Sequence, residues 1–254
     1  MRRPDAALLS AAGLALAVAA FSACAGSPST ADAIARVPSA RQASVIPGAV
    51  LIESGRPGPR VAIVGGIHGD EASGIAAAEA QVARLSGRLS RGAVLVVAVA
   101  NPLAAASRSG PSGLDLNRLF PGGEGSPGPE AARAVELFLT LRAYDLVVDL
   151  HEEGPAWLES DRPTLVTNAQ SAAIALSALE GMDGAAGGAG VGLSEAGFAF
   201  TGGAPQGSLN YELGKVGTAA LTVEVPARLP LPERLGLQSL AVSALLAALG
   251  LLAP

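Results

Sequence analysis

Short, almost uninterrupted apolar runs recur along the chain and alternate with longer stretches of helical character. Six runs are predicted to be strands: residues 49–54, 60–66, 92–100, 144–150, 163–168 and 218–225. Several of them, such as "GAVLVVAVA", are nearly continuous Val, Leu and Ala, as expected for strands buried on both faces of a largely parallel sheet. Residues 71–87, 127–142 and 169–182 have helical spacing and few helix breakers. Residues 232–252 are predicted to be a last helix, apolar nearly all round, that packs on the sheet. The alternation predicts a single α/β domain in which an open, mostly parallel, twisted sheet carries helices on both faces.

Composition limits the possible partners of this domain. An apolar fraction of 50% over 254 residues supplies ample material for one core, and aromatic residues at 3% leave Ala, Val and Leu to build it. The net charge of −5, without a dense Lys/Arg run, gives no electrostatic footprint for nucleic acid. We therefore exclude nucleic acid as a partner.

The first 24 residues resemble a bacterial lipoprotein signal peptide. Arg2 and Arg3 form a basic start, residues 6–21 form an apolar run, and "FSAC" ends at Cys24, the single cysteine of the chain. We expect Cys24 to be lipidated and to attach the protein to a membrane of the cell envelope, on its extracytoplasmic side. An uncleaved membrane anchor is the alternative.

Residues 25–45 are small, polar and punctuated by proline, so they are predicted to be a flexible tether. The folded domain is then expected over residues 46–254. A glycine-rich stretch at 184–192 is either a mobile lid or flexible surface chain.

Polar side chains follow several of the predicted strands at their carboxyl ends. In open α/β sheets, ligands bind beyond these ends. His68 and His151 each follow an apolar run, and Glu224 lies near the end of another. The loop after residues 92–100 adds four polar residues: Arg108, Asp115, Asn117 and Arg118. Four strand ends therefore bring ligand-forming groups toward one rim of the predicted sheet.

His68, Glu71 and His151 are candidate metal ligands. A catalytic zinc site uses three protein ligands of nitrogen or oxygen type and leaves one position open. His68 and Glu71, three residues apart where a strand turns into a helix, could converge on one ion, and His151 could be the third ligand from a neighbouring strand. The alternative is that His68 is simply a solvated residue in a glycine-rich turn.

The stretch "DLNRLFPG", residues 115–122, is a candidate substrate-binding segment. Arg118 can hold a carboxylate through two parallel hydrogen bonds, and Asn117 can add a third. Asp115 could accept a proton from the far nitrogen of a liganding histidine and so orient it. The competing interpretation is a surface loop with an Asx-turn and an ordinary salt bridge.

Glu224 and Arg108 are the candidate catalytic groups. Glu224 interrupts an apolar strand, where burial would raise its pKa and suit it to carry protons; at a sheet edge it could equally be solvated. Beside a metal-activated water it would act as general base and then as acid for the leaving amine. Arg108 is left for the developing oxyanion.

Four motifs, "GGIHGDE", "NPLAAASRSGPSGLDLNRLFPG", "DLHEEG" and "TVEVP", together resemble the zinc carboxypeptidase superfamily, and most closely its succinylglutamate desuccinylase/aspartoacylase branch. The resemblance covers most of residues 48–250. It implies a zinc carboxypeptidase-like fold with one Zn²⁺ per chain. It also implies the following roles: His68, Glu71 and His151 as ligands, Glu224 as general base, Asn117 and Arg118 on a substrate carboxylate, and Arg108 on the carbonyl.

Three functions are consistent with this interpretation of the sequence. The first is a zinc-dependent hydrolase that removes the acyl group from an N-acylated amino acid with a free carboxylate. The second is a metallocarboxypeptidase that acts on small or cell-wall peptides. The third is a binding lipoprotein that retains the scaffold without catalysis.

Overall fold

The computed structural model describes residues 40–42, 46–110, 115–122, 128–152, 162–180 and 196–252. Within these ranges eight strands form one sheet in the order β1-β2-β4-β3-β5-β8-β6-β7. The strands are β1 (Ala40–Gln42), β2 (Val50–Glu53), β3 (Arg60–Gly65), β4 (Ala93–Val97), β5 (Leu146–Glu152), β6 (Thr164–Thr167), β7 (Ala199–Gly202) and β8 (Ala220–Val225). The predicted single α/β domain with one sheet is confirmed.

The centre of the sheet is parallel and its flanks are mixed. β3 runs parallel to both β4 and β5, and β5 runs parallel to β8. β2 joins β4 and β6 joins β8 in the antiparallel sense. The buried patterns of β5 and β8 explain the continuous apolar runs, since both faces of these strands are covered. The carboxyl ends of β3, β5 and β8 therefore meet at one edge of the sheet.

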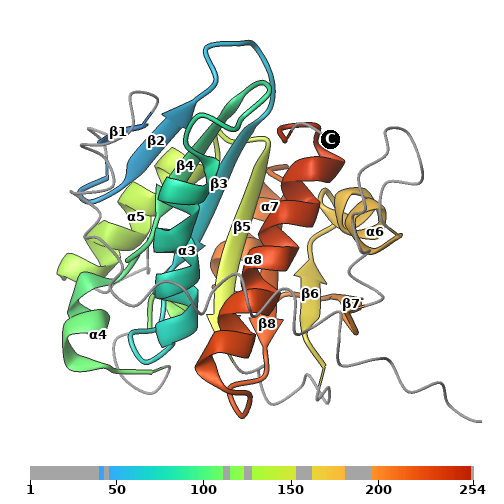
Figure 1. Cartoon of the computed structure of the whole chain (residues 1–254). Helices are drawn as coiled ribbons and strands as arrows, with labels where there is room; N and C mark the ends of the chain where they lie inside the picture. The colour runs from blue at the N-terminus through green and yellow to red at the C-terminus, as the bar shows by residue number, and fades with distance from the viewer. Residues whose placement is uncertain are drawn as a thin grey trace, which may run out of the picture.

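Helices cover both faces of the sheet (Figure 1). α3 (Ala72–Leu85), α6 (Ala172–Glu180) and α8 (Leu231–Ala248) pack on one face, and α5 (Pro129–Leu141) and α7 (Leu209–Lys215) pack on the other. Two hydrophobic clusters follow from this layering. In β3, Val61 and Ile63 join the cluster under α3, whereas Ala62 and Val64 join the cluster on the opposite face.

Several short elements were not expected from the sequence. α4 (Pro102–Ser107), the 3₁₀ turn η1 (Leu116–Arg118), β7 and α7 are too short to show a clear periodicity. Asn101 caps the start of α4 by accepting a hydrogen bond from the Ala104 N–H with its side chain, and Arg108 caps its end in the left-handed conformation, with φ of 49°. Polar capping chemistry, not hydrophobic spacing, sets these bounds.

The predicted tether needs correction at its end. β1 lies inside the segment 25–45, and it pairs with β2 in the antiparallel sense. The predicted signal peptide, with Cys24, and the glycine-rich stretch 184–192 lie outside the described residues. In the part of the chain that is described, no helix combines the length and apolar character needed to span a bilayer.

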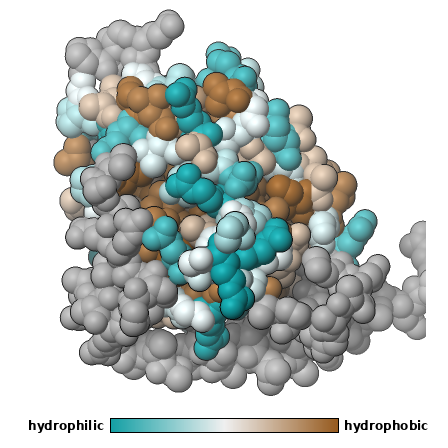
Figure 2. All heavy atoms as spheres, turned by 90° about the horizontal axis from the view of Figure 1, so that it is seen from above, coloured by the Kyte–Doolittle hydropathy of each residue, from teal (hydrophilic) through white to brown (hydrophobic). Residues whose placement is uncertain are grey.

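Figure 2 shows the surface of the molecule as it is seen from above in Figure 1. Hydrophobic residues on this face form small groups that are separated by hydrophilic ones. Such a mixture is ordinary for a folded domain, because apolar atoms contribute a large share of any protein surface.

Candidate metal centre

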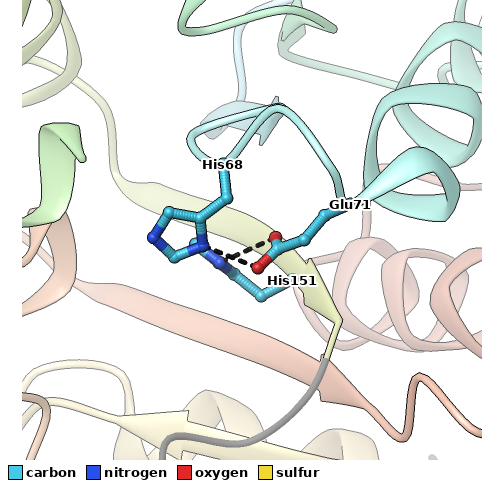
Figure 3. A group of neighbouring side chains, drawn as sticks. All are labelled: His68, Glu71 and His151. Carbon is cyan, nitrogen blue, oxygen red and sulfur yellow. Dashed lines mark hydrogen bonds and ion pairs between the residues drawn. The ribbon is translucent and has the colours of Figure 1, made fainter. Parts of the chain in front are cut away.

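The two histidines of the chain face the same carboxylate, that of Glu71 (Figure 3). His68 lies in the turn between β3 and α3, Glu71 directly precedes α3, and His151 lies near the end of β5. His68 Nδ1 is 2.6 Å from Glu71 Oε1, and His151 Nδ1 is 3.0 Å from Glu71 Oε2. The two rings meet edge to face with centroids 4.8 Å apart. One nitrogen of each histidine and the Glu71 carboxylate thus point to a common spot.

Each histidine has a second carboxylate behind its other ring nitrogen. His68 Nε2 is 3.2 Å from Asp115 Oδ1, and His151 Nε2 is 2.9 Å from Asp149 Oδ2. A carboxylate in this position fixes the ring orientation and keeps Nδ1 turned toward the centre.

Asp149 was not anticipated from the sequence, although a signal for it exists. It is an acidic residue in the otherwise apolar start of "LVVDLHE", two positions before His151. Residues two apart in a strand point to the same face, so the pair could have been recognised from spacing.

The charges of the centre depend on one another. Burial alone would lower the pKa of His68, but the hydrogen bonds that it donates to Asp115 and Glu71 outweigh this effect and raise the pKa to about 9. The same balance applies to His151. Burial lowers its pKa, but Asp149 and Glu71 together raise the pKa well above the usual value. Burial works against the Glu71 carboxylate too, but the two histidines lower its pKa.

Glu224 lies beside His151 on the neighbouring strand. The two residues are direct partners in the parallel β5–β8 ladder, where strands are about 4.8 Å apart. Glu224 is 7% exposed, and its Oε2 has no hydrogen-bond partner among the described residues. Burial raises its pKa to about 8; the charge on His151 opposes this rise, and the negative charge of Glu71 adds to it. A carboxyl group that titrates near neutral pH can both take up and release a proton.

Asn117 is placed between the centre and α7. Its backbone N–H donates to Asp115 Oδ1 at 2.8 Å, which is the Asx-turn considered from the sequence. Its side-chain Oδ1 accepts the N–H of Leu209 at 3.1 Å, and its Nδ2 lies 3.5 Å from His151 Nε2. His151 Nε2 pairs with Asp149, so it does not need to accept a hydrogen bond from Asn117. The side-chain NH₂ group of Asn117 can therefore donate to a ligand.

Arg118 is next to the centre but points to solvent. Its side chain is 60% exposed, its Nη1 donates to the Asn117 carbonyl at 2.8 Å, and its Nε is 3.8 Å from Asp115 Oδ2. It lines an open cavity of about 650 Å³ together with Glu212 and Lys215 of α7, which pair with each other at 2.8 Å.

Arg108 makes no hydrogen bond or ion pair with His68, Glu71 or His151 among the described residues, although the next residue, Ser109, accepts the N–H of Gly69 beside His68 at 2.8 Å. Arg108 lies at the exposed end of α4, and its side chain has no hydrogen bond or ion pair among the described residues. Its role at the carbonyl stays a prediction.

Close packing of α3 on the sheet brings Glu71 to His151. A Cβ atom at Gly74 would lie 2.6 Å from the carbonyl oxygen of Leu150, and one at Gly65 would lie 2.5 Å from the carbonyl oxygen of Gly74. Only glycine lets the first turn of the helix approach β3 and β5 this closely. The start of α3 is thereby held against the strand that carries His151.

The donor set fits a divalent transition ion. The nearest ligand atoms of His68, Glu71 and His151 all lie within 4.8 Å of one another, and all three residues are buried. Imidazole nitrogens and one carboxylate are ligands that zinc commonly takes. The two outer carboxylates match the partners that liganding histidines need. By donor chemistry and orientation, the residues present fit a zinc ion.

Residues 57–247 of the chain match the family model of the succinylglutamate desuccinylase/aspartoacylase catalytic domain. The chain belongs to this family. The predicted resemblance is therefore confirmed, and all three candidate ligands and Glu224 lie within the matched range. No curated protein sequence matches the chain significantly.

Several solved structures share the fold. The succinylglutamate desuccinylase/aspartoacylase from Rhodobacter sphaeroides is 21% identical with a TM-score of 0.61, over 81% of this chain and 60% of its own. The ectoine utilization protein EutE (DoeB) from Ruegeria pomeroyi, with product bound, is 20% identical with a TM-score of 0.61, over 81% and 61% of the two chains.

A third match comes from a cell-shape protein. The product-bound cell shape determinant protein Csd4 from Helicobacter pylori is 20% identical with a TM-score of 0.60, over 79% of this chain and 55% of its own. The chain thus spans 60% and 61% of the length of the first two of these structures.

Proposed function

We propose that this chain is a zinc-dependent hydrolase that cleaves the amide bond of a small substrate with a free carboxylate, of the N-acyl amino acid type. The observation that carries the proposal is the register of β5 and β8. It sets the carboxyl group of Glu224, whose Oε2 has no hydrogen-bond partner among the described residues, beside His151, one of three residues that face a common spot. Membership of a hydrolytic family supports the same conclusion.

His68, Glu71 and His151 would hold the ion, with Asp115 and Asp149 orienting the two rings. When bound, zinc supplies Lewis acidity, which acidifies water and polarises a carbonyl oxygen. Glu224 would take the proton from the attacking water and deliver it to the amine nitrogen as the amide bond breaks. Its raised pKa suits the second step, because the protonated form is then present near neutral pH.

The substrate carboxylate would bind at Arg118, with the free amide hydrogen of Asn117 as a second donor. The exposed guanidinium on the open cavity supports this assignment, since Arg binds planar carboxylates through paired hydrogen bonds. The positive charge of Lys215 on the same cavity is balanced by Glu212.

A metallocarboxypeptidase that acts on small or cell-wall peptides is the second candidate. Its support is the structural likeness to a cell shape determinant protein, together with the predicted envelope location. Both activities would use the same residues.

A substrate panel tests both candidates. Purified protein is loaded with Zn²⁺, its metal content is measured, and N-acyl amino acids are compared with cell-wall peptides. Release of an amino acid from the first class supports the proposed deacylase, and release of a C-terminal residue from the second supports the carboxypeptidase. Zinc-loaded protein that hydrolyses neither class would favour the binding lipoprotein.

We also propose that the protein is anchored in the cell envelope through lipid on Cys24. The basic start, apolar run and small residues before the cysteine support this assignment. Mass spectrometry of the mature protein tests it: a lipidated N-terminal Cys24 is expected, and an intact, unmodified Met1 would contradict the proposal.

A further inference from the structure

Glu152 has no part in the proposed reaction, yet it is built into the support of the centre. It is the last residue of β5, and its side chain lies on the opposite face of the sheet from that of His151. The side chain is only 5% exposed. A buried carboxylate is costly unless it is paired and hydrogen-bonded, so its partners show what it stabilises.

The two oxygens of Glu152 contact two different helices. Oε1 accepts the backbone N–H of Ser73 near the start of α3, and Oε2 pairs with Nη1 of Arg234 in α8. One turn further along α8, Gln238 Nε2 donates to the backbone carbonyl of His151 at 3.0 Å. α8 therefore holds the last two residues of β5, and Glu152 connects this strand end to the start of α3.

α3 needs such a partner because its own capping residue is occupied elsewhere. Glu71 is the N-cap of α3, yet it makes no side-chain cap hydrogen bond, since its carboxylate faces the two histidines. The first turn of α3 also has no acidic residue. The first N–H groups of a helix require acceptors, and negative charge is favourable there. Glu152 provides both from a neighbouring strand.

We propose that Glu152, held by Arg234, caps α3 in place of Glu71 and thereby leaves the Glu71 carboxylate free to bind the metal ion. Glu152 is thus a positioning residue, and the inference rests on the proposed zinc site. It ties the start of the helix that follows Glu71 to the strand end that carries His151. Loss of its carboxylate should let these two elements shift relative to each other.

Binding of Zn²⁺ and Co²⁺ alone tests this role without a substrate. Glu152→Ala is expected to weaken Zn²⁺ binding about 10- to 100-fold, the range seen for outer partners of metal ligands, in competition with a chelating indicator. The visible absorption spectrum of the Co²⁺-loaded variant should also change. Glu152→Gln keeps an acceptor for Ser73 but loses the charge that pairs with Arg234, so its affinity should lie between those of the wild type and Glu152→Ala.

Asn168→Ala is the matched control. Asn168 Oδ1 accepts the N–H groups of Ser171 at 3.1 Å and of Ala220 at 3.3 Å, so its loss removes a cap next to α6, away from the centre. This variant should be less stable in denaturant but should bind Zn²⁺ like the wild type. Equal weakening of Zn²⁺ binding by Asn168→Ala and Glu152→Ala would overturn the inference, because general destabilisation would then explain both.

The remaining outcomes separate this inference from the proposed function. Wild-type Zn²⁺ affinity and an unchanged Co²⁺ spectrum in both Glu152 variants would overturn the capping role and leave the zinc site standing. Failure of the wild-type protein to bind Zn²⁺ would overturn both. If Glu152→Ala does not fold, Glu152→Gln decides the question by the same two measurements.

Discussion

Glu71, Asp115 and Asp149 are each paired with a histidine, whereas Glu224 has no such contact among the described residues. A carboxylate beside an imidazole stabilises its charge and orientation. For Glu71, burial opposes the charged form, but the two histidines lower its pKa. Glu224 instead keeps a raised pKa because burial is not offset by a hydrogen-bond donor. The same residue type thus has two distinct states in one site, and only Glu224 is suited to carry protons.

Replacement of Glu224 directly tests whether this residue carries protons in the reaction. Glu224→Gln should lower the hydrolysis rate by roughly 100-fold or more, since a positioned general acid or base contributes about 10²- to 10⁴-fold. Zinc content, measured by elemental analysis, should stay at the wild-type level. Glu79→Gln, an exposed Glu of α3, is the control and should leave the rate unchanged. Wild-type turnover in Glu224→Gln would remove this residue from the mechanism.

The pKa of His68 predicts how zinc affinity depends on pH. Zinc needs the neutral imidazole, so below the pKa of about 9 a proton must leave His68 when the ion binds. His151, whose pKa is also raised, must lose a proton too, so affinity should fall at least tenfold for each pH unit below 9, as measured by chelator competition at several pH values. A flat profile between pH 6 and 9 would contradict the expectation.

The same pKa shift has the opposite effect on the metal-free protein. The pKa of His68 is raised from 6.5 to about 9 on folding, so its stabilising contribution is complete below pH 6.5 and is lost as the pH rises through 9. Asp115→Asn is the matched variant. It removes a hydrogen bond that raises the pKa of His68, so both pH dependences should shift to lower pH.

At the level of elements, the centre depends on how closely α3 approaches the sheet. The helix carries Glu71 at its start, and β5 carries His151 near its end. Gly74 allows the first turn of α3 to touch the backbone of Leu150, one residue before His151. The absence of a side chain at Gly74 therefore determines how closely α3 can approach β5.

Gly74→Ala should increase the distance between α3 and β5. Its Cβ would lie 2.6 Å from the Leu150 carbonyl oxygen, so α3 must move away from β5. Zinc affinity should fall at least tenfold, and the free energy of unfolding in urea should fall by about 1–3 kcal/mol, as in other overpacked sites.

Gly236→Ala provides the control within another helix. Gly236 lies inside α8, and a Cβ there would meet no atom within 4 Å. Because alanine favours helix over glycine by up to about 1 kcal/mol, this variant should be at least as stable as the wild type and should bind zinc equally well. Equal behaviour of the two Gly→Ala variants would show that the α3 contact has no special role.

For the whole molecule, the centre joins segments that are far apart in the sequence. His68 follows β3, and His151 lies in the neighbouring parallel strand β5. Asp115 caps η1, and α8 supports the end of β5 from the C-terminal part of the chain. An ion bound by groups from several elements stabilises all of them together, because these groups do not converge in the unfolded chain.

Zinc should therefore raise the stability of the entire domain. At 100 times its dissociation constant, a ligand that binds only the folded state adds about 2.7 kcal/mol to the free energy of unfolding. Thermal unfolding should accordingly shift upward by roughly 5–10 °C with zinc, and addition of EDTA should reverse the shift. His151→Ala, which lacks one ligand, should show no zinc-dependent shift; a shift of wild-type size would place the ion elsewhere.

Much of the fold follows from local sequence. The central strands have continuous apolar runs because both of their faces are buried. α3 has the spacing of an amphipathic helix, and α8 is a long run of mostly apolar residues. The short elements α4, β7 and α7 could not be recognised in this way, since their bounds depend on capping side chains and on pairing with β6. β1 lies in a segment whose composition predicts a tether, because its strand structure depends on pairing with β2 and not on an apolar run.

The sequence by itself determined the residue types at the strand ends: two histidines and several carboxylates that follow apolar runs, in the order typical of one family. Tertiary structure alone decided their pairing. Strand register set Glu224 beside His151, and packing of α3 and α8 turned Glu71 toward the histidines while Glu152 took over its capping role. The physical reason is that spacing along a chain specifies which face a side chain occupies, whereas its partner across the sheet depends on strand order and close packing.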